Sequence, residues 1–141
     1  MTDVQFLLAH GSRNPQWRKP FEQIAERLQL AHPERRIVLC YLEMWEPSLD
    51  QAIREAYVLG FRHFRISPLF WSSGRHLQED LPTLIEQVQK VLPNCFFQVE
   101  GPIGESEIII QAALQSEHEQ HRSDDTSGQY GGPKPEGVCT R

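Results

Sequence analysis

Hydrophobic and polar positions follow two different periods along the first hundred residues. Residues 4–9 (VQFLLA) form a short apolar run, which predicts a buried strand, and Gly11 and Pro15 follow it as turn residues. From Trp17 to residue 31 the apolar positions take helical spacing, and they place Phe21, Ile24, Ala25 and Leu28 on one face. The first unit is therefore predicted to be a strand, a loop and a helix.

The same unit recurs along the chain. Residues 36–42 (RIVLCYL) predict a second strand, after which Pro47 is expected to open a helix that ends at Gly60. Residues 63–70 (HFRISPLF) predict a third strand, followed by a glycine-containing loop and a helical stripe from Leu81 to Val91. A fourth strand is predicted at CFFQVE, residues 95–100, and a last helix at about 105–117.

Strands that alternate with helices predict an α/β fold with right-handed crossovers. We expect three layers, in which helices cover both faces of a mostly parallel, four-stranded sheet. This domain is predicted to span residues 1–118. Residues 119–141 are rich in Gly, Pro, Ser and charge, so they are predicted to form a disordered C-terminal tail.

Size and charge narrow the classes of function. A chain of 141 residues suits one domain, and a net charge of -5 argues against a broad nucleic-acid surface. No apolar run is long enough to span a membrane and no signal-peptide pattern begins the chain, so we expect a cytoplasmic protein with no membrane partner. Cys40, Cys95 and Cys139 lack CxxC spacing, which argues against a disulfide framework or a thiolate zinc site.

Polar residues with useful chemistry follow each of the first three predicted strands. In open α/β sheets, ligands bind beyond the carboxyl ends of the strands, so these loops are the candidate site. The three loops contain His10, Gly11, Ser12 and Arg13; Glu43, Met44, Trp45 and Glu46; and Ser72, Ser73, Gly74, Arg75 and His76.

Two imidazoles and a carboxylate, with no thiolate, suit a borderline divalent ion such as Co, Ni or Fe(II). A histidine also accepts a proton near neutral pH, so metal binding and base catalysis are both open to His10 and His76. Arg13 and Arg75 flank the two histidines and indicate an anionic ligand. The amides of Gly11, Ser12, Ser73 and Gly74 could add hydrogen-bond donors.

Simpler interpretations of these residues stay open. His10 could be satisfied by backbone carbonyls, His76 could be a solvated surface histidine, and the arginines could be separate solvated charges. Glu43 and Glu46 could both precede and cap the helix at Pro47, Glu46 with the stronger claim. Capping or surface roles are expected for His32 and His63, and a frayed helix end for His118 and His121, which could otherwise gather a loosely held metal.

Three stretches resemble the small sirohydrochlorin chelatases of the class II chelatase superfamily, the CbiX type. They are LLAHGSRNPQWRKPFEQIA, YLEMWEPSLDQAI and ISPLFWSSGRHLQEDLP, in family order between Val4 and Val99. HGSR alone is moderately specific, whereas its combination with PLF-x-x-x-G-x-H-x-x-x-D-x-P is a strong signal. Trp71 and the serines after it depart from many relatives, which show Leu and Gly there.

The resemblance implies insertion of a metal ion into the tetrapyrrole sirohydrochlorin without ATP, in cobalamin or siroheme-type cofactor biosynthesis. Cobalt is favoured, with nickel or iron as alternatives, and no organic cofactor is expected. The family's metal-binding and catalytic histidines fall on His10 and His76, and its acidic residue falls on Glu43, ahead of Glu46. The eight carboxylates of sirohydrochlorin would meet Ser12, Arg13, Ser73, Gly74 and Arg75 as substrate-binding residues.

Larger members of the superfamily resemble two such units side by side, so a homodimer is expected here. Two rival functions stay open. A non-catalytic metal or tetrapyrrole carrier would bind the macrocycle without changing its rate of metallation. A histidine phosphatase would use His10 as a nucleophile, but Ala9 stands where that motif has an arginine, which leaves the phosphate clamp incomplete.

Overall fold

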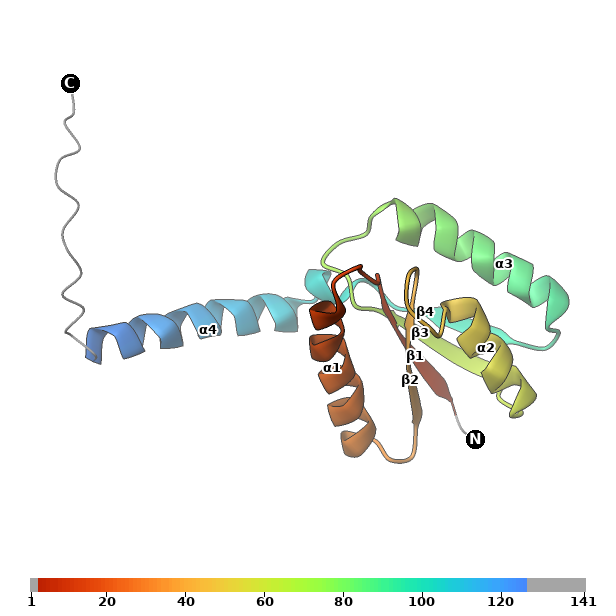
Figure 1. The fold of residues 1–141 in the computed structure, drawn as a ribbon, viewed down its shortest axis with the longest axis horizontal. Coiled ribbons are helices and arrows are strands. Elements are labelled where there is room, and N and C mark those ends of the chain that lie inside the picture. The colour runs from red at the N-terminus through yellow and green to blue at the C-terminus, as the bar shows by residue number, and fades with distance from the viewer. Residues whose placement is uncertain (1–2, 127–141) are drawn as a thin grey trace, which may run out of the picture. The chain divides into compact units, whose positions relative to one another are not determined.

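The computed structural model describes residues 3–126, apart from the side chains of His76, His121 and 123–126. The strands are β1 (Val4–Ala9), β2 (Arg36–Tyr41), β3 (His63–Pro68) and β4 (Phe96–Val99). The α-helices are α1 (Arg18–Ala31), α2 (Leu49–Val58), α3 (Leu81–Val91) and α4 (Glu107–Thr126). Three shorter turns of helix are η1 (Pro15–Trp17), η2 (His76–Asp80) and η3 (Ile103–Glu105). The four strands are those that the hydrophobic pattern predicts (Figure 1).

The sheet is parallel throughout, with the strand order β2-β1-β3-β4. The predicted α/β class is therefore confirmed. After β1 the chain crosses to β2 on one side, and after β2 it returns past β1 to β3 on the other. This reversal leaves a topological switch point between β1 and β3, where ligands bind in open α/β sheets.

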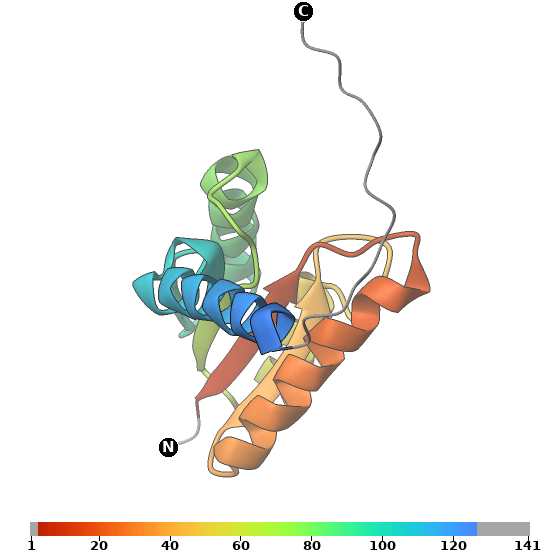
Figure 2. The ribbon, with the colours of Figure 1, turned by 90° about the vertical axis from the view of Figure 1, so that its left-hand side faces the viewer.

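Helices cover both faces of the sheet (Figures 1 and 2). Side chains along β1 alternate between these two faces. Val4, Phe6 and Leu8 point into the buried core. The same core takes residues from α2 and α3, namely Leu49, Ala52, Ile53, Ala56, Leu81 and Val88. Gln5 and Leu7 face the other way, toward Ile24 and Leu28 of α1, whose residues are all at least partly exposed.

The start of α2 differs from the expectation. The helix begins at Leu49, and its N-cap is Ser48, which forms a capping box with Gln51. Ser48 Oγ accepts from the Gln51 amide at 3.2 Å, and Gln51 Oε1 accepts from the Ser48 amide at 3.0 Å. The expected capping roles of Glu43 and Glu46 are therefore wrong, and both glutamates lie in the loop that precedes the cap.

The described part of the chain divides into two units, of which the first ends at Ser106 and the second begins at Glu107. The second unit contains α4, which runs to Thr126 and so extends past the expected end near Glu117. Residues 127–141 lie outside the described part of the chain, so the boundary at 118 and the disordered tail stay predictions. Within residues 3–126, no helix has the length and apolar character needed to cross a membrane.

Candidate active site

The segments that follow β1 and β3 meet at the switch point. The Leu69 amide donates to the Leu8 carbonyl at 2.8 Å, so the pairing of the two strands continues past the register partners Leu8 and Pro68. One step further, the rings of His10 and Phe70 lie 4.8 Å apart at an angle of 32°. Phe70 is buried, whereas His10 is exposed. A buried ring thus supports an imidazole that solvent can reach.

Gly11 lets the segments after β1 and β2 come into direct contact. The Leu42 amide donates to the Ala9 carbonyl at 2.9 Å, and the Glu43 amide donates to the His10 carbonyl at 3.1 Å. Gly11 has a φ of +91°, and a methyl group on it would overlap the backbone carbonyl of Glu43. Only glycine combines this backbone angle with this close approach. Figure 2 shows the two segments side by side.

The contacts of Glu43 distinguish it from Glu46 as a candidate site residue. Its amide bonds to His10, and its side chain starts beside Gly11. Met44, the next residue, has a φ of 66°, an unusual angle for a residue other than glycine. The loop is held there because the Trp45 amide donates to the Glu43 carbonyl at 2.8 Å. These contacts favour Glu43 over Glu46 as the carboxylate beside His10.

The loop after β3 is fixed by residues that follow β4. Glu105 Oε1 accepts from the Ser73 amide at 3.1 Å and from the Ser73 hydroxyl at 3.3 Å. The Gly104 amide donates to the Phe70 carbonyl at 2.9 Å, and a methyl group on Gly104 would overlap the Trp71 backbone. In this structure Glu105 therefore engages the Ser73 amide, which was predicted to face an anionic ligand, and also the Ser73 hydroxyl.

His76 begins the π-helical segment η2, which leads directly into α3. Gly74 positions this segment, because its carbonyl accepts from the amides of Leu77 and Gln78, both at 3.1 Å. π-helical turns are rare and are frequently found at functional sites. The side chain of His76 lies outside the described part of the structure, so its proximity to His10 stays a prediction. Among the described residues, no three His, Cys, Asp or Glu side chains gather as a metal site.

The predicted anion-binding residues lie at the same edge of the sheet. Arg13 is exposed, and Ser12 Oγ accepts from the Asn14 amide at 3.1 Å. The Arg75 side chain is 83% exposed, with its Nε 3.2 Å from Glu79 Oε2. Neither arginine is held rigidly by burial, so each could turn toward an anion at low cost.

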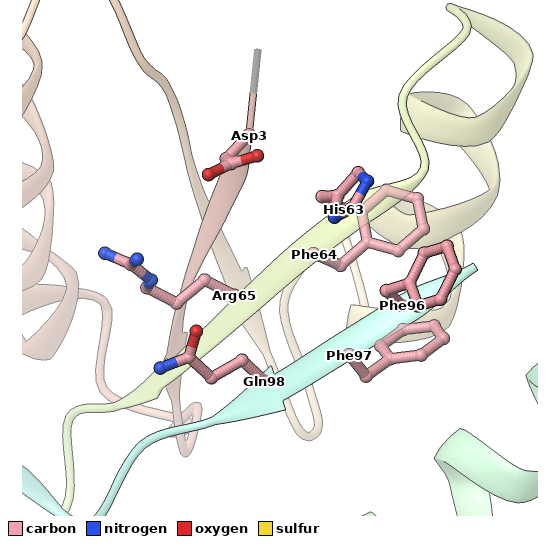
Figure 3. A pocket seen from close by; sticks show the side chains of 7 residues that line it. All are labelled: Asp3, His63, Phe64, Arg65, Phe96, Phe97 and Gln98. Atoms are coloured by element: carbon pink, nitrogen blue, oxygen red, sulfur yellow. The ribbon is translucent and has the colours of Figure 1, made fainter. Parts of the chain in front are cut away.

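One groove borders the segment after β3, and a smaller hollow lies at the opposite end of the sheet. A groove of about 630 Å³ lies between α1, Gln5 and the segment after β4, and its lining includes Glu100 and Glu105. These two carboxylates would repel a polyanion, so the groove does not suit a polyanionic ligand. A smaller hollow of about 160 Å³ lies at the amino ends of β3 and β4, where the rings of His63 and Phe96 stack 5.0 Å apart (Figure 3). His63 is thus at the sheet edge opposite His10.

The sequence did not single out Phe70 or Glu105 as site residues. Phe70 was read only as part of an apolar strand, and its contact with His10 depends on how two separate strands pair. Glu105 meets Ser73 across 32 positions of sequence, which no local spacing indicates. The one signal that could have included Glu105 is its position shortly after the fourth predicted strand, at the start of the predicted last helix.

The fold is an open, parallel α/β domain with an exposed histidine, His10, at its switch point. The CbiX family model matches residues 5–120. The chain belongs to the CbiX family. The matched span contains all three loops of the candidate site.

Curated relatives agree with this family. The sirohydrochlorin cobaltochelatase of Methanosarcina barkeri is 27% identical over 121 residues, which cover 77% of this chain and 91% of the relative. That of Methanopyrus kandleri is 29% identical over 79 residues, covering 56% of this chain and 55% of the relative. The match therefore spans about half the length of several curated relatives.

Solved structures share the fold. A crystal structure described as a cobalamin (vitamin B12) biosynthesis CbiX protein from Marinobacter aquaeolei has a TM-score of 0.74 and 32% identity, covering 86% of this chain and 98% of that one. The sirohydrochlorin chelatase SirB from Bacillus subtilis, in complex with cobalt, has a TM-score of 0.74 at 20% identity. This chain covers 51% of SirB, so at the level of the fold it corresponds to half of that protein.

Proposed function

We propose that the protein is a chelatase that inserts a divalent metal ion into sirohydrochlorin, within cobalamin or siroheme-type cofactor biosynthesis. The observation that carries this proposal is the family match over residues 5–120, which includes His10, Glu43 and His76. Cobalt is the favoured ion, because the relatives from Methanosarcina barkeri and Methanopyrus kandleri are named cobaltochelatases. Iron and nickel are the alternatives, and a chloroplast sirohydrochlorin ferrochelatase is 22% identical to this chain.

Metallation requires that the ion lose water while two pyrrole nitrogens of the macrocycle lose protons. A neutral imidazole can bind a divalent ion or accept a proton, and an exposed one at the switch point can do both. We assign the leading role to His10, which is supported by Phe70, and an assisting role to His76. The Glu43 carboxylate would attract the ion and accept protons. Its loop is placed beside His10, because the Glu43 amide donates to the His10 carbonyl.

The macrocycle would lie over the carboxyl edge of the sheet. Arg13 and Arg75, together with Ser12, Ser73 and Gly74, would face its carboxylates. The donors of Ser73 would become available only if the substrate displaced Glu105. No organic cofactor enters this proposal.

A second copy of the chain would supply the other wall of the substrate cleft, since this chain corresponds to about half of the SirB fold. Sedimentation analysis would then give a mass of twice 16.3 kDa at the concentrations at which the protein is active. A monomeric mass under those conditions would contradict the homodimer and leave the assignment of the reaction to the assay below.

The direct test is anaerobic spectroscopy of sirohydrochlorin with Co, Ni or Fe(II). We expect the wild type to accelerate metallation over the blank, and His10→Ala and His76→Ala to lose most of that acceleration. His63→Ala is the matched control, because His63 lies at the opposite edge of the sheet and should leave the rate unchanged. Equal rates for the wild type and the blank would contradict the chelatase and favour a carrier that binds sirohydrochlorin without metallating it.

A further inference from the structure

A cluster of three side chains borders the candidate site on the α1 side of the sheet. Arg18 is the first residue of α1, Tyr41 is the last residue of β2, and Trp45 lies in the loop that carries Glu43. Tyr41 is the register partner of Ala9, the residue before His10. The backbone of Tyr41 is therefore one position along the strand pair from that of His10.

Two aromatic rings hold the Arg18 guanidinium in place. Its Cζ atom lies 5.5 Å from the centre of the Tyr41 ring and 5.3 Å from that of Trp45. The two rings meet edge to face, with centres 5.1 Å apart. A cation at this distance from an aromatic face is attracted by the ring quadrupole. The guanidinium is thus ordered before any ligand arrives, which lowers the entropic cost of binding.

The inner side of the cluster contains two buried polar atoms whose contacts lack good hydrogen-bond geometry. Tyr41 is 1% exposed and interacts with the Arg18 side chain, but neither its hydroxyl nor the Arg18 Nε atom makes a hydrogen bond of good geometry among the described residues. The Nε atom lies 3.2 Å from Glu22 Oε1, an ion pair without good hydrogen-bond geometry. Unsatisfied buried donors are uncommon because they cost free energy.

The outer side of Arg18 stays accessible, because 39% of its side chain is exposed. Arginine presents five N–H donors in a planar fork that matches a carboxylate. Arg13 and Arg75 are exposed surface residues, whereas Arg18 alone among these three is seated on aromatic rings. A carboxylate that approached from the side of the Glu43 loop would meet this ordered fork.

We propose that Arg18, seated on Tyr41 and Trp45, is a binding subsite for a peripheral carboxylate of the substrate. This inference rests on the proposed function, because it takes the anionic tetrapyrrole as the ligand. The subsite orients the macrocycle over His10 and takes no part in proton or metal transfer. Its loss should therefore weaken binding and leave the chemical step nearly unchanged.

The test uses Arg18→Met in the full chain, with Arg27→Met as the matched control from an exposed position of the same helix. The dissociation constant of metal-free sirohydrochlorin is followed by its own fluorescence, and KM and kcat by cobalt insertion. We expect Arg18→Met to raise both the dissociation constant and KM about tenfold, with kcat within about twofold of the wild type. Arg27→Met should match the wild type.

A second arm separates charge recognition from packing. For the octamethyl ester of sirohydrochlorin, which has no free carboxylates, the dissociation constants of Arg18→Met and wild type should agree. Arg18→Lys keeps the charge but lacks the planar fork. Its dissociation constant for sirohydrochlorin itself should therefore lie between those of the wild type and Arg18→Met. If circular dichroism shows that Arg18→Met does not fold, Arg18→Lys serves as the test protein instead.

The outcomes separate this subsite from the proposed function. A wild type that does not metallate sirohydrochlorin contradicts the chelatase, whatever the variants do. A wild type that metallates, with Arg18→Met binding the acid within twofold of it, overturns the subsite alone. An equal loss of affinity for acid and ester would also overturn it, because the effect would then come from packing.

Discussion

At the scale of single residues, Gly11 is the position on which the geometry of the site most depends. It joins the segment that carries His10 to the segment that carries Glu43, and a side chain there would meet both a positive φ and a neighbouring carbonyl. Gly60 offers a matched comparison, because it has a φ of +100° but nothing within 4 Å of where a methyl group would stand. The pair separates backbone strain from steric overlap.

Gly60→Ala should lower the free energy of unfolding by about 1 kcal/mol, the cost of the backbone angle alone. Gly11→Ala should cost at least about 2 kcal/mol and abolish most of the metallation rate, because the loop of Glu43 must move away from His10. Urea unfolding and the metallation assay measure the two effects. Equal stability losses in the two variants, with activity kept by Gly11→Ala, would contradict the described contact.

The buried thiol of Cys40 should make the stability of the folded protein depend on pH in the alkaline range. Burial raises the pKa of the Cys40 thiol from 9.0 to about 12, and burial also raises the pKa of Cys95. Between pH 9 and 12 the unfolded chain therefore binds fewer protons than the folded chain, so stability falls as pH rises in that range. Below about pH 8 these thiols should have no effect.

The urea concentration at the midpoint of unfolding should therefore be lower at pH 10 than at pH 8. Cys40→Ala should be less stable at both pH values, because it leaves a small cavity, but its midpoint should change less with pH. Buried Tyr41, whose pKa is also raised, adds to the decline only at higher pH. A midpoint with the same pH dependence in both proteins would show that Cys40 is not the cause.

At the scale of elements, the start of α2 is determined by Ser48 and not by the glutamates before it. The capping box with Gln51 satisfies backbone donors of the first turn, and Asp50 adds a favourable charge there. The end of the loop that carries Glu43 is held beside β2, since the Tyr41 amide donates to the Pro47 carbonyl at 3.0 Å.

Ser48→Ala should lower the free energy of unfolding by about 1 kcal/mol, the usual cost of losing a serine cap. Gln23→Ala, at an exposed position of α1, is the control and should change it by less than about 0.5 kcal/mol. Chemical denaturation measures both values. A Ser48→Ala protein as stable as Gln23→Ala would mean that α2 begins elsewhere.

Within the loop after β3, the Ser73 amide and hydroxyl are held by the carboxylate of Glu105 in η3. Glu105→Ala should free the Ser73 amide and speed its hydrogen exchange, because no other acceptor for it is described. Glu107→Ala is the control, since that side chain accepts only from Gln111 among the hydrogen bonds described for it. Unchanged exchange at Ser73 in Glu105→Ala would contradict this role.

At the scale of the whole molecule, the strands and the fold class follow from the hydrophobic pattern because each element has a strong period of its own. Residues 4–9 were predicted to form a strand and form β1, and the helical stripe predicted from Leu81 to Val91 corresponds to α3. The contact of Phe70 with His10 and the stack of Arg18 on Trp45 were not predictable. They depend on strand order and on residues brought together from distant positions, which local patterns do not contain.

We propose that His10 and His76 act on one metal ion at the switch point between β1 and β3. The most direct measurement is the anaerobic rate of cobalt insertion for the wild type, His10→Ala, His76→Ala and the double variant. If both histidines serve one ion, the double variant should be no slower than about the slower single variant, because residues that act as a unit are not additive. Rate losses that multiply in the double variant, or a wild-type rate in either single variant, would contradict the claim.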